Sequence, residues 1–344
     1  MKRPWKQEPR KQEPLKRPMP AEAAACASRL EVRENFLYDV VEGLTRYPKA
    51  LSSRWFYDEE GSRIFEAIMR LPEYYPTACE TRILETRRRD ILDAFGGLPF
   101  HVVDLGAGNG AKTRILLNYF AKQGCLLGYA PVDVSRGVLD RLVNGLCVDH
   151  PGLSITPLVG EYFDALKDWR PIPGGRKLAL FLGSNIGNFD RADAVDFLRS
   201  LRGTLGQGDG LLIGFDLRKE PARILRAYSD SAGVTARFNL NLLHRINREL
   251  GGDFHPEAFR HHALCDPVQG VARSYLVARR SQAVSIGAAG LTVHFRAGES
   301  LHTENAFKYS VEETDSMARD SGFTAAAQYL DPTGSFLDSL WLPA

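Results

Sequence analysis

The sequence is poor in the residues that build disulfides and metal sites. Its 344 residues include only five cysteines and eight histidines. The cysteines are odd in number, widely spaced and without a Cys-x-x-Cys pair, which is typical of reduced thiols in a cytoplasmic protein. His261 and His262 are the only adjacent histidines, and neighbouring side chains diverge on a helix or strand. The sequence therefore predicts no metal site and a cytoplasmic location.

Long apolar runs and a strong excess of one charge are also missing. The longest uncharged runs, such as residues 178–189, fall well short of the ~18 residues that cross a membrane. The net charge is +2, and seven Lys/Arg against two Glu fall within residues 1–20, so the remainder is near neutral. We therefore expect neither nucleic acid nor a membrane as a partner.

The first residues differ from the rest of the chain in composition. Lys-Gln-Glu-Pro and Lys-Arg-Pro each occur twice within residues 1–20, and no apolar face accompanies them. Such a segment cannot bury enough apolar surface to fold, and it lacks the apolar core of a signal peptide. We expect residues 1–28 to form a disordered basic tail.

What the sequence does contain is an apolar stretch that runs into a glycine turn. Val102-Val103-Asp104-Leu105 precedes glycines at 106, 108 and 110, and residues 112–122 have the pattern of a helix. Glycines let the backbone approach a ligand closely, and a helix N-terminus favours anionic groups. The turn is thus predicted to hold either a dinucleotide pyrophosphate or the adenosyl half of a methyl donor.

Strand and helix patterns alternate between residues 78 and 217, which predicts a parallel, doubly wound α/β sheet. The alternation of strands and helices is absent at 29–77 and again at 218–308. In the second of these segments, a helical stretch (222–250) precedes strands expected at 274–279, 283–287 and 291–296. A helix at 311–321 and strands at 323–329 and 336–342 then return to the sheet as a closing hairpin. We expect a sheet domain of 78–217 plus 309–344 and a discontinuous α+β lobe of 29–77 plus 218–308.

The neighbours of the glycine turn favour S-adenosylmethionine over NAD(P). Asp104 stands just before the first glycine, where dinucleotide sites are usually apolar. Asp133 ends the next strand and suits ribose hydroxyls in either case, whereas Glu161-Tyr162 after the third strand suits the amine and ring of adenine. Lys112, directly after the glycines, is placed for the carboxylate of the methyl donor. The terminal hairpin also favours a methyltransferase sheet, by analogy of fold.

From about residue 35 to the end, the chain resembles the L-histidine Nα-methyltransferases of ergothioneine biosynthesis, which are class I S-adenosylmethionine-dependent enzymes. The resemblance is specific because many motifs match in the same order. They are Trp55-Phe-Tyr-Asp58, Leu71-Pro-Glu-Tyr-Tyr-Pro-Thr77, Phe181-Leu-Gly-Ser-Asn-Ile-Gly-Asn188, Asp216-Leu-x-Lys219, Ala227-Tyr-x-Asp-x-Ala-Gly-Val-Thr235, Asn247-Arg-Glu-Leu250 and Glu304.

This resemblance implies a Rossmann-like donor domain with a discontinuous substrate lobe, and three methylations of the histidine α-amine that give hercynine. It implies an enzyme that takes a small amino-acid substrate, and we expect a monomer. Tyr57 and Asn188 would be the catalytic positioning residues, with Tyr74 and Tyr228 also holding the amine and carboxylate and Glu304 meeting the imidazole. The implied donor site is Gly106, Lys112, Asp133, Glu161, Tyr162 and the backbone near Ser184, and the implied amino-acid site also includes Phe65 and Gly183.

Three positions depart from the family pattern. Glu161 replaces an aspartate, Ala306 replaces a serine for the imidazole, and Ser274 replaces an apolar methionine in the wall of the ring pocket. The amine and carboxylate positions are intact, so histidine is the first expectation, and a tryptophan-like amino acid or a non-catalytic donor-binding protein are the alternatives. The acceptor of the amine proton stays open between water, the substrate carboxylate and a tyrosine.

Overall fold

The computed structural model describes residues 21–167, 169 and 175–344, so residues 1–20 of the expected tail lie outside the described residues. Its centre is an eight-stranded sheet in the order β12-β13-β6-β5-β1-β2-β3, with β4 also paired to β2. The strands are β1 (Phe100–Leu105), β2 (Leu126–Asp133), β3 (Ser154–Ile155), β4 (Leu158–Val159), β5 (Arg176–Phe181), β6 (Gly210–Asp216), β12 (Phe323–Leu330) and β13 (Phe336–Pro343).

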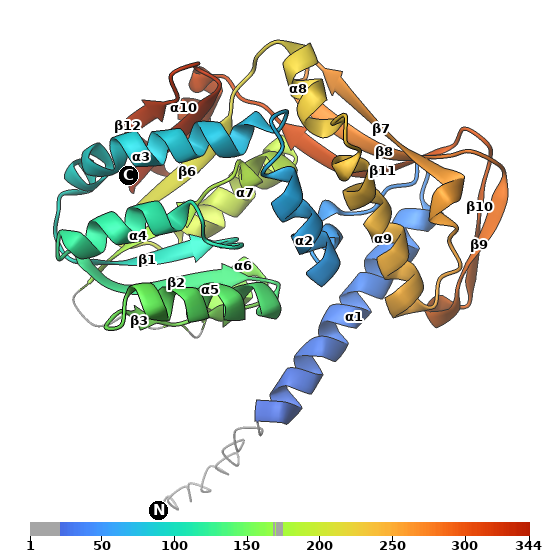
Figure 1. Cartoon of the computed structure of the whole chain (residues 1–344), viewed down its shortest axis with the longest axis horizontal. Coiled ribbons are helices and arrows are strands. Elements are labelled where there is room, and N and C mark those ends of the chain that lie inside the picture. Colours follow the sequence, from blue (N-terminus) through green and yellow to red (C-terminus); the bar gives the residue numbers. More distant parts are fainter. Residues whose placement is uncertain (1–20, 168, 170–174) are drawn as a thin grey trace, which may run out of the picture.

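The strands from β6 to β3 and β4 run parallel, and helices cover both faces of the sheet (Figure 1). Successive side chains of a strand point to opposite faces, so Val102 packs into one core and Val103 into the other. One face carries α3 (Tyr75–Phe95), α4 (Thr113–Lys122) and α5 (Arg136–Asp149), and the other carries α6 (Tyr162–Lys167), α7 (Arg191–Arg202) and α10 (Val311–Asp320). This confirms the doubly wound α/β fold.

The closing hairpin also lies where the sequence predicted it. β13 pairs antiparallel with both β6 and β12, so the hairpin forms the edge of an otherwise parallel sheet. Helix α10 begins with a capping box in which Ser310 and Glu313 satisfy each other's backbone N–H groups. The cap fixes the direction in which the chain enters α10 and, after it, the hairpin.

A third hydrophobic core lies beside the sheet and joins segments that are far apart in sequence (Figure 1). Phe36, Phe56, Phe238 and Leu242 are among its buried members. Its elements are α1 (Ala21–Thr45), η1 (Ser53–Phe56), α2 (Glu59–Ile68), α9 (Val234–Leu250), the hairpin β9 (Gln282–Ile286) and β10 (Leu291–Phe295), and the sheet of β7 (Phe259–Asp266), β8 (Val271–Ala278) and β11 (Ser300–Phe307). We call this part of the molecule the lobe.

Helix boundaries differ from the sequence expectation in two places. Helix α1 begins at Ala21, before the boundary expected after residue 28, because its first turns are rich in alanine, the residue with the highest helix propensity. The helical stretch expected at 222–250 is two helices, α8 (Pro221–Tyr228) and α9. Gly233, with φ of 69°, adopts the left-handed conformation at the start of α9 and separates them.

The sequence analysis missed two strands of the lobe, β7 and β11. The alternation of β11 is interrupted by a bulge between His302 and Glu304, which obscures the period of two on which a strand prediction depends. Its partner β8 is regular and covers the strand expected at 274–279. The missed strand is important because it carries Glu304.

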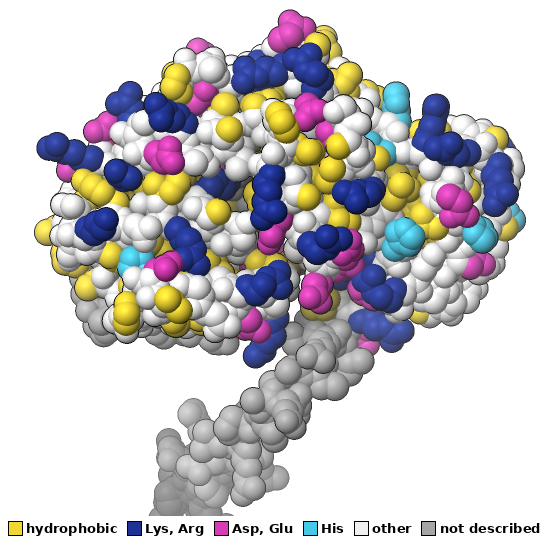
Figure 2. All heavy atoms as spheres, in the orientation of Figure 1, with side chains coloured by type: hydrophobic (Ala, Val, Ile, Leu, Met, Phe, Trp, Pro, Cys, Tyr) yellow, Lys and Arg dark blue, Asp and Glu magenta, His cyan; other side chains and the backbone are white. Residues whose placement is uncertain are grey.

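Charges of both signs are interspersed over the face of the molecule shown in Figure 2. In the part of the chain that the structure describes, no helix combines the length and apolar character needed to cross a membrane. Among the same residues, no group of three or more His, Cys, Asp or Glu side chains converges on a point where a metal ion would bind.

Candidate active site

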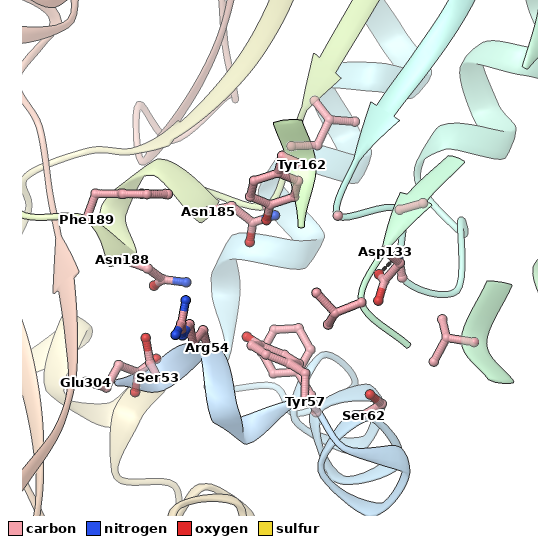
Figure 3. Close-up of a pocket in the computed structure, with 18 of the residues that line it drawn as sticks. Ser53, Arg54, Tyr57, Ser62, Asp133, Tyr162, Asn185, Asn188, Phe189 and Glu304 are labelled. Carbon is pink, nitrogen blue, oxygen red and sulfur yellow. Dashed lines mark hydrogen bonds between the residues drawn. The ribbon is translucent and has the colours of Figure 1, made fainter. Parts of the chain in front are cut away.

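A cavity of about 760 Å³ lies between the carboxyl ends of the parallel strands and the lobe (Figure 3). Ligands of open α/β sheets bind at this edge. Figure 3 places Glu304 and Asn188 on one side of the cavity and Asp133 on the other, with Tyr57 between them. Most of the predicted site residues line it: Tyr57, Phe65, Tyr74, Gly106, Lys112, Asp133, Glu161, Tyr162, Gly183, Asn188 and Glu304.

The glycine turn forms one end of the cavity, where its conformation requires glycine. Gly106, Gly108 and Gly110 have φ of 77°, 55° and 66°, in the left-handed region. A Cβ on Gly106 would lie 2.9 Å from Asn185 Nδ2 and 3.3 Å from the Tyr162 hydroxyl. The turn therefore lines the cavity with backbone atoms that carry no side chains, which lets a ligand approach closely.

Two aspartates hold the glycine turn in different ways. Asp133 accepts hydrogen bonds from the backbone N–H of Gly108 at 3.0 Å and of Ser135 at 2.9 Å. Asp104 is buried beneath the turn, where it accepts bonds from Thr113 Oγ1 at 2.7 Å and from the Tyr129 hydroxyl at 2.8 Å. Burial raises the pKa of Asp104 to about 6. Asp133 thus presents a carboxylate at the end of β2, where ribose hydroxyls can reach it.

Tyr162 and Glu161 complete the wall beside Asp133. The Tyr162 ring lies 5.6 Å from Phe181 and 5.7 Å from Phe197, both edge-on, so it is fixed by an aromatic cluster. Glu161 is exposed, and one of its carboxylate oxygens lies 3.9 Å from Arg54 Nη1 of the lobe. The Glu161–Arg54 contact joins the two sides of the cavity. A planar ring placed beside Tyr162 would lie close to the Glu161 carboxylate.

Lys112 is held by a carboxylate that the sequence analysis did not identify. Its ammonium pairs with Glu80 of α3, a residue with no solvent exposure. The other Glu80 oxygen accepts the backbone N–H of Gly183 at 2.7 Å. Glu80 thereby joins α3, the glycine turn and the loop after β5, and it lines the cavity together with Lys112 and Gly183.

The opposite end of the cavity is lined by aromatic rings. Tyr57 contacts Phe65 with ring centroids 5.5 Å apart, and Phe65 contacts Tyr74 at 6.1 Å, in both cases edge-to-face. Burial raises the pKa values of Tyr57 and Tyr74 well above the usual range. Both hydroxyls are therefore neutral near pH 7, so they serve as hydrogen-bonding groups and not as bases.

Glu304 is the carboxylate at this end of the cavity. The bulge in β11 re-aims the chain, so that Thr303 bonds to the buried Asn239 at 2.7 Å while Glu304 lines the cavity. Ser274 donates a hydrogen bond of 3.3 Å to Glu304 Oε2 from the neighbouring strand. Burial raises the pKa of Glu304 to about 7, so small changes of environment decide whether it is ionised.

Four predicted site residues are not part of the cavity wall. Ser274 and Ala306 were expected in a ring pocket, but both are buried: Ser274 lies beside Glu304 on the neighbouring strand, and Ala306 belongs to the hydrophobic core that also includes Tyr228. Ser184, with φ of 56°, uses its hydroxyl to accept the backbone N–H of Asp216, while Gly183 and Asn185 on either side line the cavity.

Tyr228 is buried behind Tyr74, with ring centroids 6.5 Å apart, and belongs to a buried charge network. Its hydroxyl accepts a hydrogen bond of 2.8 Å from Lys308, which also pairs with Asp216 at 2.8 Å. Asp216 pairs in turn with Lys219. The motif Asp216-Leu-x-Lys219 pointed to two members of this network. Nothing in the sequence pointed to Lys308, because a lysine is buried only where the fold brings partners to its charge.

The raised pKa of Glu304 has a consequence for stability. An unfolded glutamate titrates near 4.5, so between about pH 4.5 and 7 the folded state keeps a proton that the unfolded state has lost. The stabilisation from this group is complete below pH 4.5 and is lost as the pH rises through 7. From pH 5 to 8, we expect the wild type to lose about 2–3 kcal/mol of unfolding free energy relative to Glu304→Gln. Parallel denaturant-unfolding profiles for the two proteins would contradict this.

Comparisons with known proteins agree with this geometry. A family model described as histidine-specific methyltransferase, SAM-dependent, matches residues 36–343. The chain is 40% identical over 316 residues to the histidine N-alpha-methyltransferase of Mycolicibacterium smegmatis, covering 92% of this chain and 95% of that protein. The protein of the same name from Mycobacterium tuberculosis is 40% identical over 299 residues, covering 87% and 92%. Ergothioneine biosynthesis protein 1 of Schizosaccharomyces pombe is 31% identical over 287 residues, covering 81% and 37%.

Proposed function

The chain belongs to the family of histidine-specific, S-adenosylmethionine-dependent methyltransferases, and we propose that it methylates the α-nitrogen of free L-histidine. Three successive transfers give the trimethyl betaine, hercynine, as a step toward ergothioneine. S-Adenosylmethionine is the methyl donor, and the reaction needs no metal ion. Relatives named for histidine N-alpha-methylation and for ergothioneine biosynthesis support this assignment.

One observation carries the proposal: a single cavity joins the glycine turn to a carboxylate-bearing aromatic pocket. The donor occupies the end formed by Gly106, Lys112, Asp133, Glu161 and Tyr162, together with the backbone around Ser184. Histidine occupies the end formed by Tyr57, Phe65, Tyr74, Gly183, Asn188 and Glu304. The α-nitrogen and the sulfonium methyl then meet in the middle of the cavity, so positioning supplies most of the rate acceleration.

In each transfer the lone pair of the α-nitrogen forms a bond to the methyl carbon, and the sulfur takes the electrons of the breaking bond. The amine must first lose a proton, since a free α-amino group is mostly protonated near pH 7. Tyr57 and Asn188 orient the nitrogen through neutral hydrogen-bonding groups, which do not hold its proton as a carboxylate would. The raised pKa values of the tyrosines make a tyrosinate base unfavourable, which leaves water or the substrate carboxylate to accept the proton.

The aromatic rings suit the later transfers. Each methyl group removes an N–H donor, and the final product carries a permanent cation. Tyr57, Phe65 and Tyr74 surround that position with ring faces and edges, and a cation on an aromatic face gains about 0.5–2 kcal/mol per ring. Hydrogen bonding for the first transfer and aromatic packing for the last are therefore available in the same place.

Glu304 is proposed to accept the imidazole N–H, with Ser274 of the neighbouring strand fixing its carboxylate. The serine for the imidazole that the sequence analysis found to be replaced by Ala306 is not required in this arrangement. Tyr228, which was expected to hold the substrate carboxylate, stands behind Tyr74 and outside the cavity wall, so its role is to support Tyr74 from the Lys308 network. A side-chain ring without an N–H would leave Glu304 unpaired, which disfavours phenylalanine as a substrate.

We further propose that the lobe (29–77 plus 218–308) binds the amino acid and that the sheet domain (78–217 plus 309–344) binds the donor. The protein acts as a monomer in the cytoplasm, without a nucleic-acid or membrane partner. The near-neutral charge of the body supports the absence of a nucleic-acid partner, and the free thiols of Cys79, Cys125, Cys147 and Cys265 suit the cytoplasm.

A panel of the twenty amino acids with S-adenosylmethionine tests the proposal, with products read as mass gains of +14, +28 and +42. We expect histidine to gain +42 and to outpace every other amino acid. A mass gain on tryptophan alone would assign the alternative substrate. No gain on any amino acid would support a non-catalytic donor-binding protein.

A further inference from the structure

The donor end of the cavity contains an ion pair whose carboxylate is completely buried. Glu80 has no solvent exposure, yet it lines the cavity and pairs with Lys112, whose side chain is 18% exposed. Charged side chains are rarely this buried unless they are paired or bind a ligand. The loop at Gly183 adds a backbone N–H to the second Glu80 oxygen, so the carboxylate is held on two sides.

A second carboxyl group stands directly behind Glu80. Asp338 of β13 is also without solvent exposure, and no described donor reaches either of its oxygens. The two carboxyls converge over Gly214 of β6: a Cβ there would overlap Glu80 Oε1 and lie 3.1 Å from Asp338 Oδ1. Burial and the proximity of Glu80 raise the pKa of Asp338 well above its usual value. The protonated form of Asp338 is therefore favoured, while Glu80 keeps its ion pair with Lys112.

The methionine moiety of the donor carries an α-ammonium and an α-carboxylate. A buried Glu80–Lys112 pair is the complement of that zwitterion. When the donor binds, one internal ion pair is exchanged for two intermolecular pairs, and no charge is left without a partner. The sequence analysis assigned only the lysine half of this arrangement.

We propose that Glu80 accepts the α-ammonium group of the donor's methionine moiety, beside Lys112, which takes the carboxylate. Asp338 is a positioning residue that holds the Glu80 carboxylate toward the cavity. The inference rests on the proposed function only for the identity of the donor, because it does not depend on which amino acid is methylated. The competing acceptor is Asp104, which also lines the cavity and is bonded to the hydroxyls of Thr113 and Tyr129.

Isothermal titration calorimetry with three donor-derived ligands tests this assignment. S-Adenosylhomocysteine has both charged groups, its decarboxylated analogue has only the amine, and 5′-methylthioadenosine has neither. We expect Glu80→Gln to weaken binding of the first two by about 10- to 100-fold and to leave the third within about twofold of wild type. Lys112→Met should weaken S-adenosylhomocysteine but spare the amine-only ligand.

Glu85→Gln, on the exposed side of the same helix, is the matched control and should bind all three ligands as the wild type does. An equal loss of 5′-methylthioadenosine in Glu80→Gln would overturn the proposal, since it would show a general collapse of the site. Retained binding of the amine-only ligand would also overturn it, because Glu80 would then act only through Lys112. A loss of the amine-only ligand in Asp104→Asn but not in Glu80→Gln would assign the ammonium to Asp104.

The Asp338→Asn variant supplies a second measurement if Glu80→Gln folds poorly. The amide of the asparagine can donate a hydrogen bond to Glu80, so we expect amine-dependent binding to survive within about threefold. A loss larger than that for the two amine-bearing ligands would contradict the positioning role. Because no methyl acceptor is present in these titrations, a failed result would leave the proposed methylation of histidine standing, and the reverse also holds.

Discussion

Glu304→Ala is expected to lower kcat/KM for histidine about 100-fold, while the affinity for S-adenosylhomocysteine stays within about twofold of wild type. The change removes the acceptor that we assign to the imidazole N–H, and it leaves that donor unpaired in a partly buried pocket. A 100-fold loss corresponds to about 2.7 kcal/mol, within the range for a hydrogen bond to a charged group. Steady-state kinetics and calorimetry separate the two effects.

Two further variants sharpen this test. Glu304→Gln keeps an acceptor without the charge and should lose about 10-fold. Glu312→Gln, at an exposed position on α10, should behave as the wild type. If Glu304→Ala weakened donor binding as much as histidine turnover, Glu304 would not belong to a separate amino-acid site, and the division of the cavity into two ends would be wrong.

Asp216→Asn is expected to destabilise the fold by about 3–5 kcal/mol, because it leaves buried lysines without their counter-charge. Asp216 has no solvent exposure and pairs with Lys219 and with Lys308, whose side chain is 2% exposed. Burial alone would raise the pKa of Asp216, but the two lysines hold it below its usual value. Denaturant unfolding measures the loss.

Asp266→Asn provides the matched control for this prediction. Asp266 lies 3.6 Å from Arg273 in a pair that keeps about a quarter of each side chain exposed to solvent, so its loss should cost less than about 1 kcal/mol. The double variant Asp216→Asn/Lys308→Met removes one orphaned cation and should recover part of the stability. A loss below about 1 kcal/mol for Asp216→Asn alone would mean that the network does not depend on this carboxylate.

The donor end was the more predictable half of the site. Apolar runs in the sequence predict two neighbouring parallel strands, and the parallel sheet brings their carboxyl ends together. At or just after these ends stand Gly106, Gly108 and Asp133. Local sequence therefore contained both the residue types and their placement. Glu80 escaped prediction because its role depends on tertiary contacts with Lys112 and Gly183, which lie far from it in sequence.

At the amino-acid end, the residue identities came from family resemblance and not from a local pattern. Periodicity did not find β11, since the bulge before Glu304 breaks the alternation. Ser274 and Ala306 were expected to contact a ring, but the pairing of β8 with β11 places Ser274 directly beside Glu304, where its hydroxyl bonds to the carboxylate. Lys308 had no sequence signal, because only the fold brings it beside Asp216 and Tyr228.

The central claim is that one cavity methylates the α-nitrogen of histidine, and a competition experiment tests it most directly. Equimolar histidine and tryptophan are incubated with the enzyme and S-adenosylmethionine labelled with ¹³C in the methyl group, and the products are analysed by mass and NMR. The account predicts three labelled methyl groups on the α-nitrogen of histidine and little label on tryptophan. Label on an imidazole nitrogen, or label chiefly on tryptophan, would contradict it.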